Sequence, residues 1–277
     1  MKRLAVLGHP VSHSRSPAMQ NAALADLGLG GEWGYEAIDL EPGEFAERTR
    51  GLPTEGFVGA NVTIPYKEAA LALADQASEA AQRIGAANTL SFRGGGIHAD
   101  NTDASGLLAA LPGPVEGRPA LVLGAGGSAR AAIWALAGQG ASVSVWNRTA
   151  ERADELVRAL AHAGEGTRSE GRIKPVSVEQ IRANGYEVIV NCTAVGMQDE
   201  DPFEQLPLEP ERFSKGVIVV DLVYAGGESR LLREARARGA TAVEGLEVLV
   251  RQGADSLRIW TDREPPLDVM RKAARAT

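Results

Sequence analysis

Short apolar runs alternate with segments of helical periodicity along most of the chain. In the first third, runs rich in β-branched residues predict strands, and the segments between them space apolar residues three or four positions apart, as helices do. Strands are expected at residues 4–8, 35–40, 57–63 and 88–92, and helices at 16–28, 42–50, 65–74 and 78–85. This alternation of strand and helix predicts a largely parallel sheet.

A second series of the same kind follows the turn-rich stretch PGPVEGRP. Strands are expected at 120–126, 142–147, 186–193 and 216–223, helices at 129–138 and 149–163, and a polar loop at 163–171. Two α/β units in tandem are therefore predicted. The tail from residue 245 carries apolar residues at helical spacing, and this pattern alone allows it to pack on either unit.

Composition narrows the possible functions. The net charge of -7 disfavours nucleic acid and anionic membranes as partners and favours a small-molecule enzyme. The single cysteine, Cys192, excludes an internal disulfide and is expected to be a small buried strand residue, and the four histidines lack zinc-ligand spacing. This spacing predicts no metal site. The chain has no apolar run of about 18 residues and no signal peptide, so we expect a cytoplasmic protein with no membrane anchor.

The segment ALVLGAGGSA has the pattern of a dinucleotide-binding turn. Gly124, Gly126 and Ala129 form G-x-G-x-x-A directly after an expected strand and at the start of an expected helix. The first glycine allows a tight turn, the second lets the backbone approach a pyrophosphate, and the alanine allows close helix packing. A simple glycine-rich turn is the alternative, because a lone motif of this kind is weak.

The end of the next expected strand favours NADP. An NAD-binding protein tends to place an acid there for the ribose 2′-hydroxyl, whereas this chain has Asn147, Arg148 and Thr149. A guanidinium and a hydroxyl suit a 2′-phosphate. Arg148 could instead be an ordinary surface arginine, but together with the glycine turn it favours NADP.

The segment ANVTIPYK places a lysine where a helix would not favour one. Pro65 is expected at the first helical position, so Lys67 falls in the first turn, where the helix dipole disfavours a positive charge. A functional role would explain the residue. The plain alternative is a solvated side chain beside Glu68.

Polar residues collect where the expected strands end or helices begin in the first unit. Hydride transfer to or from NADP requires a proton donor or acceptor, and with no suitably placed histidine the candidates are lysine, tyrosine or a carboxylate. The clusters are Ser12, His13, Ser14 and Ser16; Asn61, Thr63 and Lys67; Asn88 and Thr89; and Asn101, Thr102 and Asp103. Individually, Ser16 and Asp103 could be N-caps and Asn88 a turn residue; together the clusters suit a compact polyhydroxylated acid.

The chain resembles the shikimate dehydrogenase family over nearly its whole length. The resemblance rests on these segments, in this order: HPVSHSRSPAMQNAA, GANVTIPYKEAAL, GAANTLSF, NTDASGLL, LGAGGSARAAIWAL, NRT, NCTAVGM, DLVY and GLEVLVRQGADSLRIW. It implies reduction of 3-dehydroshikimate to shikimate with NADPH, a step of the shikimate pathway towards chorismate and the aromatic amino acids. It also implies a substrate-binding and catalytic domain at 1–104, completed by 245–277, and a Rossmann NADP domain at 105–244, with a cleft between them.

The family's functional residues can be transferred to matching positions of this sequence. Lys67 and Asp103 correspond to the catalytic pair, with the carboxylate holding the lysine in place. The resemblance implies a substrate site formed by Ser14, Ser16, Asn61, Thr63, Lys67, Asn88, Asp103, Tyr224 and Gln252, the two serines for the carboxylate. It implies a cofactor site formed by Gly124, Ala125, Gly126, Gly127, Ser128, Ala129, Asn147, Arg148, Thr149, Thr193 and Gly245. Gln252 could instead be a surface residue that flanks the apolar stripe of the tail.

Three departures from the family pattern stand out. Gln20 replaces an expected histidine and should affect packing under the serine loop, Val248 replaces a common methionine near the nicotinamide, and AGGESRLL follows Tyr224 in place of a more usual proline and threonine.

Alternatives remain open at this stage. A relative that also oxidises quinate, with NAD or NADP, is one, although Arg148 argues against NAD. A non-catalytic sensor of shikimate or NADP is another, although the pair Lys67 and Asp103 argues against it. The serine loop and the NVT segment match folate or glutamate-semialdehyde dehydrogenases poorly. A monomer or a homodimer is expected.

Overall fold

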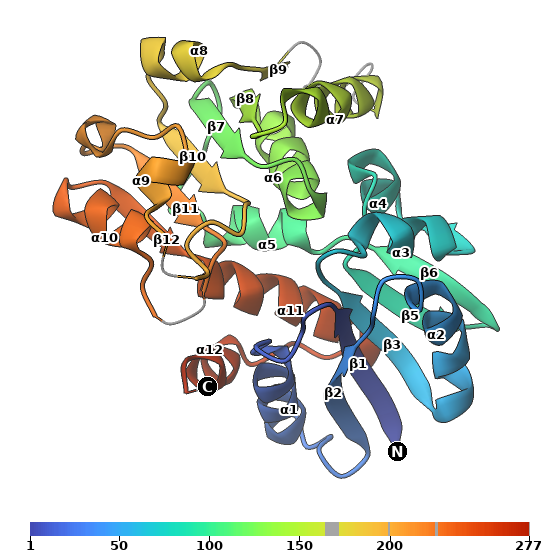
Figure 1. Cartoon of the computed structure of the whole chain (residues 1–277). Coiled ribbons are helices and arrows are strands. Elements are labelled where there is room, and N and C mark those ends of the chain that lie inside the picture. The colour runs from blue at the N-terminus through green and yellow to red at the C-terminus, as the bar shows by residue number, and fades with distance from the viewer. Residues whose placement is uncertain (164–171, 199, 225–226, 277) are drawn as a thin grey trace. The chain divides into compact units, whose positions relative to one another are not determined.

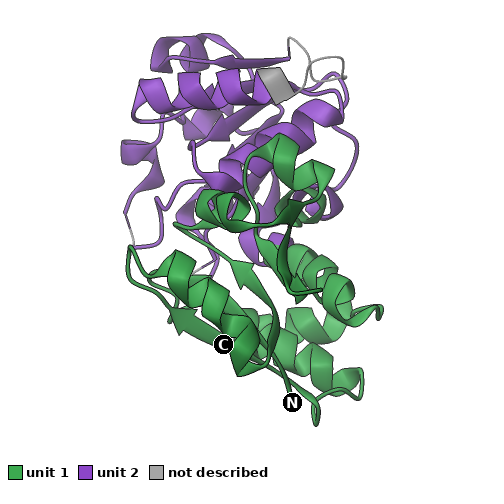
Figure 2. Cartoon of the chain, turned by 90° about the vertical axis from the view of Figure 1, so that its right-hand side faces the viewer, with its two compact units in different colours: residues 1–106, 249–277 green, residues 107–248 purple. Residues whose placement is uncertain are grey.

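The computed structural model describes residues 1–163, 172–198, 200–224 and 227–276. Most of the polar loop predicted at 163–171, and residues 225–226 of the AGGES segment, lie outside the described residues. The chain divides into two compact units: unit 1 is residues 1–106 with 249–277, and unit 2 is residues 107–248 (Figure 2). The tail from Leu249 onward therefore belongs to unit 1.

The described part of unit 1 holds a six-stranded, mostly parallel sheet in the order β2-β1-β3-β5-β6-β4 (Figure 1). The strands are β1 (Lys2–Gly8), β2 (Trp33–Asp39), β3 (Phe57–Val62), β4 (Gln76–Ala77), β5 (Thr89–Arg93) and β6 (Gly96–Asp100). β1 pairs in parallel with β2 and β3, whereas β5 runs antiparallel to β3 and β6. The reversal occurs at a hairpin through Gly94 and Gly95, whose φ angles of 61° and 77° suit glycine. Strands β4 and β6 were not predicted from the sequence.

Helices of unit 1 follow the predicted segments closely. They are α1 (Ser16–Asp26), α2 (Phe45–Gly51), the 3-10 helix η1 (Leu52–Glu55), α3 (Lys67–Leu73), α4 (Glu79–Ile84), and α12 (Leu267–Arg275), which packs against α1. Two further helices, α5 (Asp103–Ala110) and α11 (Gly245–Thr261), begin in one unit and continue in the other. Stacked rings of Phe45 and Tyr66, 4.6 Å apart, join the core under the sheet.

The described part of unit 2 holds a parallel six-stranded sheet in the order β12-β11-β10-β7-β8-β9. The strands are β7 (Pro119–Leu123), β8 (Ser142–Trp146), β9 (Ile173–Pro175), β10 (Val188–Asn191), β11 (Ile218–Asp221) and β12 (Thr241–Glu244). The helices are α6 (Gly127–Gly138), α7 (Ala150–Ala163), α8 (Val178–Ala183), α9 (Pro202–Gln205), η2 (Pro210–Arg212) and α10 (Arg230–Ala237). The winding direction reverses between β7 and β10, and sheets of this kind bind ligands at such a switch point.

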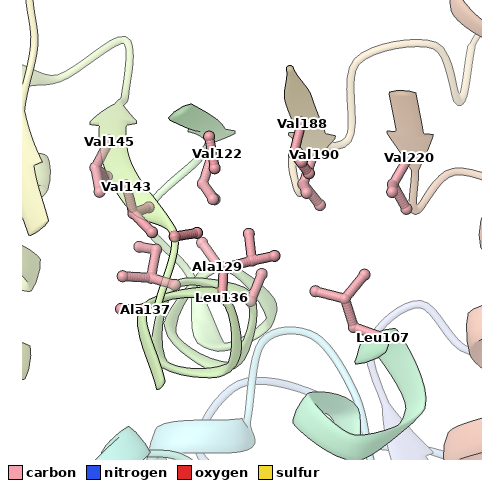
Figure 3. Packing of buried hydrophobic residues seen from close by; sticks show 14 of the residues in the cluster. Leu107, Val122, Ala129, Leu136, Ala137, Val143, Val145, Val188, Val190 and Val220 are labelled. Atoms are coloured by element: carbon pink, nitrogen blue, oxygen red, sulfur yellow. The ribbon is translucent and has the colours of Figure 1, made fainter. Parts of the chain in front are cut away.

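The core of unit 2 explains why its strands are continuous apolar runs. Valines of β7, β8 and β10 point towards α6, where Ala129 and Ala137 let helix and sheet approach closely, and Val220 of β11 lies nearer to Leu107 of α5 (Figure 3). A second cluster, including Leu121 and Val219, packs the opposite face of the sheet. Because both faces are buried, the strands alternate little between apolar and polar residues. The predicted two-unit α/β architecture is thereby confirmed. Among the residues described, none of the helices combines the length and apolar character of a bilayer span.

Candidate active site

Lys67 opens helix α3 directly after a turn. The N–H of Tyr66 donates to the carbonyl of Thr63 at 2.9 Å, and Tyr66 is the N-cap residue of α3. Pro65 therefore lies in the turn, in a cis peptide bond with Ile64, and the expectation that it would be the first helical residue is wrong. The turn carries the chain from the end of β3 to a lysine at the first helical position.

Asp103 opens helix α5 and faces Lys67. The side-chain oxygen of Asn101 accepts from the N–H groups of Asp103 at 3.1 Å and Ala104 at 3.4 Å. Asn101 therefore caps the helix, and the alternative that Asp103 is only an N-cap is wrong. Lys67 Nζ lies 2.6 Å from Asp103 Oδ2, with 11% and 16% of the two side chains exposed. The solvated alternative for Lys67 is wrong as well, because the lysine forms a largely buried ion pair.

Asn88 connects this ion pair to helix α11. Its Nδ2 donates to Asp103 Oδ1 at 2.9 Å, to Thr102 Oγ1 at 2.9 Å and to Gln252 Oε1 at 3.0 Å. Its Oδ1 accepts from the N–H of Thr102 at 2.8 Å. Gln252 is only 8% exposed, and its Nε2 donates to the carbonyl of Leu249 at 2.9 Å. Asn88 is thus more than a turn residue, and Gln252 is not a surface residue.

The Asn61 amide lies deeper in the same network. Its Nδ2 donates to the carbonyl of Asn88 at 3.1 Å, to Ser256 Oγ at 2.9 Å and to Thr89 Oγ1 at 3.3 Å. Its Oδ1 accepts from the hydroxyl of Tyr35 at 2.8 Å. An amide nitrogen has two hydrogens and a carbonyl oxygen two lone pairs. Asn61 can therefore offer a ligand the remaining lone pair on Oδ1.

The serine loop begins the neighbouring helix. Ser16 is the first residue of α1 and is buried, Arg15 is the N-cap residue, and the N–H of Ser16 donates to Ser14 Oγ at 3.3 Å. The alternative that Ser16 is the N-cap is therefore wrong. A Cβ on Gly8, at the end of β1, would lie 2.4 Å from Thr63 Cγ2, so the glycine lets the loop start beside the end of β3.

An ion pair holds the start of the serine loop. His9 Nδ1 lies 2.6 Å from Asp39 Oδ1 at the end of β2, and Asp39 Oδ2 accepts from the N–H of Val11 at 3.1 Å. The hydrogen bond that His9 donates to Asp39 raises the pKa of His9 above its ordinary value of 6.5, with the charge of Glu41 adding to the effect. The bonds to His9 and Val11 lower the pKa of Asp39 in return. The network thus fixes the loop from the sheet side.

The glycine turn of unit 2 has the geometry of an anion site. Gly124 follows β7 with a φ of 111°, and a Cβ there would lie 3.3 Å from the backbone of Cys192, so the residue must be glycine. Gly126 is the N-cap residue of α6, and apart from its chain neighbours no described atom lies within 4 Å of where its Cβ would be. A glycine with open space beside it, at the N-terminus of a long helix, suits a pyrophosphate.

The other residues that were predicted to bind the cofactor lie along the same edge of unit 2. Arg148 is exposed just after β8, the neighbour of β7, and Asn147 Nδ2 donates to the carbonyl of Thr149 at 2.9 Å. Thr193 Cγ2 lies 3.4 Å from the Cβ position of Gly124. Gly245 follows β12, and a Cβ on it would lie 2.6 Å from the carbonyl oxygen of Asp221.

Two sequence departures have structural explanations. Val248 is buried in the core of unit 2, which accounts for an apolar residue there. Gln20 is fully buried, and its Nε2 donates to the carbonyl of Gly253 at 2.9 Å, so it ties α1 to α11 as the expected packing role requires. Gln20 Oε1 has no hydrogen-bond partner among the described residues.

The structure therefore joins five predicted substrate residues through one hydrogen-bonded network: Asn61, Lys67, Asn88, Asp103 and Gln252. Thr63 and the two serines belong to the same unit, whereas Tyr224 follows β11 in unit 2. The roles of Ser256 and Tyr35 were not predicted, and Cys192, expected as a buried strand residue, directly follows β10 and is partly buried. No group of three metal-ligating side chains occurs among the residues described.

Three stretches of the chain match families of known proteins. Residues 6–90 match the shikimate dehydrogenase substrate binding domain. Residues 108–196 match shikimate / quinate 5-dehydrogenase, and residues 245–275 match the shikimate 5'-dehydrogenase C-terminal domain.

Full-length relatives agree with this assignment. The shikimate dehydrogenase (NADP(+)) of Symbiobacterium thermophilum is 42% identical over 282 residues, covering 99% of this chain and 93% of that protein. Shikimate 5-dehydrogenase of Thermus thermophilus, crystallised with NADP(H) and shikimate, is 43% identical with a TM-score of 0.86, covering 100% of this chain and 99% of that one. The Listeria monocytogenes enzyme, crystallised with shikimate and NAD, is 29% identical with a TM-score of 0.84, covering 98% and 96%. The chain therefore belongs to the shikimate dehydrogenase family.

Proposed function

We propose that this protein reduces 3-dehydroshikimate to shikimate with NADPH, and that Lys67 and Asp103 are its catalytic pair. The observation that carries the proposal is the 2.6 Å contact between Lys67 Nζ and Asp103 Oδ2 within a network of neutral amides and hydroxyls. Binding alone does not require a buried lysine paired with a carboxylate, whereas reduction of a carbonyl requires a proton donor.

Lys67 supplies the proton in this proposal. As the substrate carbonyl becomes a hydroxyl, Lys67 Nζ donates a proton to its oxygen and recovers one from water. Asp103 holds the ammonium through Oδ2, while Asn88 holds Asp103 through Oδ1 at 2.9 Å. An arginine at position 67 could not take this role, because a guanidinium does not lose its proton in proteins.

The remaining residues of unit 1 are proposed to bind the substrate. The hydroxyls of Ser14 and Ser16 bind the carboxylate, and Thr63, Asn88 and Gln252 bind ring hydroxyls. Asn61 accepts from a ring hydroxyl, because its amide hydrogens already have protein acceptors. Tyr224 is proposed to assist with the carboxylate.

Unit 2 is proposed to hold NADP(H). The open space at Gly126 and the N-terminus of α6 fit a pyrophosphate, and the exposed Arg148, with Asn147 and Thr149, fits a 2′-phosphate. Ala125, Gly127, Ser128 and Ala129 complete the turn, and Thr193 and Gly245 are assigned to the same site. When bound, NADPH supplies the hydride.

A dual-specificity enzyme is the second candidate. The family model that matches residues 108–196 is described as shikimate / quinate 5-dehydrogenase, and the Listeria relative was crystallised with NAD. Initial rates with shikimate or quinate, each with NADP or NAD, decide between the two. Turnover confined to shikimate with NADP supports the first proposal, comparable quinate or NAD turnover supports the second, and binding of shikimate without turnover would contradict both.

We also propose that the protein is cytoplasmic and acts as a monomer or a homodimer. Light scattering on the purified protein should give the mass of one chain or two. A larger assembly would contradict this part of the proposal.

A further inference from the structure

The hydroxyl of Ser256 connects several segments of the network in unit 1. It lies on α11 and is fully buried. Its Oγ accepts from Asn61 Nδ2 at 2.9 Å, lies 2.8 Å from Thr89 Oγ1 and 3.1 Å from Thr102 Oγ1, and donates to the carbonyl of Gln252 at 3.0 Å. One hydroxyl thus connects strands β3 and β5, the segment before α5, and the helix that carries Gln252.

Ser256 helps to orient the side-chain amide of Asn61 by accepting a hydrogen bond from it. Asn61 Nδ2 faces the carbonyl of Asn88 and Ser256 Oγ, with Thr89 Oγ1 farther away at 3.3 Å, while its Oδ1 faces the hydroxyl of Tyr35. A flipped amide would place Oδ1 against the Asn88 carbonyl, so that two acceptors face each other, and would withdraw the Asn61 donor from Ser256 Oγ. Removing the Ser256 hydroxyl takes away one of the contacts that prevent this flip.

Ser256 also connects the three amides proposed to bind substrate hydroxyls, those of Asn61, Asn88 and Gln252. Thr102 Oγ1, 3.1 Å from Ser256 Oγ, accepts from Asn88 Nδ2 at 2.9 Å and lies 3.4 Å from Gln252 Oε1. A change at Ser256 therefore reaches Asn61 directly and Asn88 through Thr102. It leaves the contact between Lys67 and Asp103 in place.

We propose that Ser256 is a positioning residue for substrate binding, which fixes Asn61 as an acceptor and aligns Asn88 with Gln252. This inference rests on the proposed function. It predicts that loss of the hydroxyl weakens substrate binding and largely spares proton donation, because the hydrogen bonds of Ser256 described above go to Asn61, Thr89, Thr102 and Gln252 rather than to the catalytic pair.

Ser256→Ala tests the proposal in the full-length protein. The KM for shikimate should rise about 5- to 30-fold, the effect of losing one or two hydrogen bonds, while kcat stays within about 3-fold and the KM for NADP is unchanged. Asn61→Ala should cost less affinity in the Ser256→Ala background than in the wild type, because the amide is already misaligned. An unchanged KM for shikimate, or additive effects, would overturn the proposal.

Thr261 provides a matched control on the same helix. Its hydroxyl donates to the carbonyl of Leu257 at 2.7 Å, as that of Ser256 does to Gln252, and none of its hydrogen bonds among the described residues reaches the substrate network. Thr261→Ala should leave the KM for shikimate unchanged, whatever it does to stability. An equal rise in both variants would mean that α11 acts only through stability. Ser256→Cys keeps the volume with a weaker acceptor and should have an intermediate effect.

A measurement without substrate separates this inference from the proposed function. Hydrogen exchange of the Asn61 side-chain amide, followed by 15N NMR, should be at least about 10-fold faster in Ser256→Ala than in the wild type and unchanged in Thr261→Ala. Unchanged exchange in Ser256→Ala would overturn the positioning role. A wild type that fails to oxidise shikimate would overturn the proposed function, and the amide measurement would still decide the role of Ser256.

Discussion

Replacing Lys67 with methionine removes the proposed proton donor while keeping most of its length. The wild-type ammonium lies 2.6 Å from Asp103 Oδ2, with 11% and 16% of the two side chains exposed. The variant loses the charge and the donated hydrogen, while Asp103 keeps its bond from Asn88 at 2.9 Å. The substitution therefore acts on the proton donor and leaves the polar network largely intact.

General acid catalysis sets the expected size of the effect. A positioned proton donor contributes about 10²- to 10⁴-fold to the rate, which corresponds to about 2.7 to 5.5 kcal/mol of activation free energy. Shikimate binding should weaken less than about 10-fold, because the serine loop and the amides of Asn61 and Gln252 remain. Breaking a buried pair can cost up to about 3 to 5 kcal/mol of unfolding free energy, so stability has to be measured alongside activity.

Single-turnover and steady-state rates of shikimate oxidation test this expectation, with shikimate affinity measured by calorimetry. Lys215→Met is the control, because Lys215 is exposed and lies in unit 2 just before β11. The control should match the wild type. Turnover of Lys67→Met within about 5-fold of the wild type, in a folded protein, would refute the role of Lys67 as proton donor.

Three other perturbations have defined outcomes. Arg148→Ala should weaken NADP binding by about 1.5 to 3 kcal/mol, the value of a hydrogen bond to a charged group, and leave NAD nearly unaffected; equal weakening of both in calorimetry would contradict a 2′-phosphate site. Gln20→Ala removes the buried bond to Gly253 and should lower the unfolding free energy in urea by about 1 to 3 kcal/mol; an unchanged midpoint would argue against the tie between α1 and α11. The pKa of His9 is raised and that of Asp39 is lowered in the folded protein, so their contact stabilises the folded state fully between about pH 4 and 6.5. This stabilisation weakens at higher pH, where His9 loses its proton, and at lower pH, where Asp39 gains one. The melting temperature of His9→Ala should therefore fall furthest below that of the wild type near pH 5.5 and approach it by pH 9, and a difference independent of pH would exclude this contact as its cause.

Much of the fold could be predicted because local signals agreed with it. The apolar runs of β1 and β7 and the glycine turn before α6 are readable from short windows, since a buried parallel strand and a dinucleotide turn have strong sequence patterns. β6 was missed because it follows the glycine run 94–96, which suggests a loop and is in fact a hairpin turn.

The candidate site was predicted by resemblance more than by pattern. Lys67 could be identified because its helix position is unfavourable, and the same pattern misplaced Pro65 within the helix. Ser256 and Tyr35 could not be identified, because their importance depends on contacts between distant segments: Ser256 is 195 positions from Asn61 in the chain. Periodicity places such residues on a helix or strand without revealing which hydroxyl they will meet.

The most direct test of the central claim is the reaction in the reducing direction. The purified protein should consume NADPH when 3-dehydroshikimate is added, and chromatography should find one shikimate formed for each NADPH oxidised. Absence of NADPH consumption, or consumption without shikimate formation, would contradict the assignment of this chain as an NADP-dependent shikimate dehydrogenase.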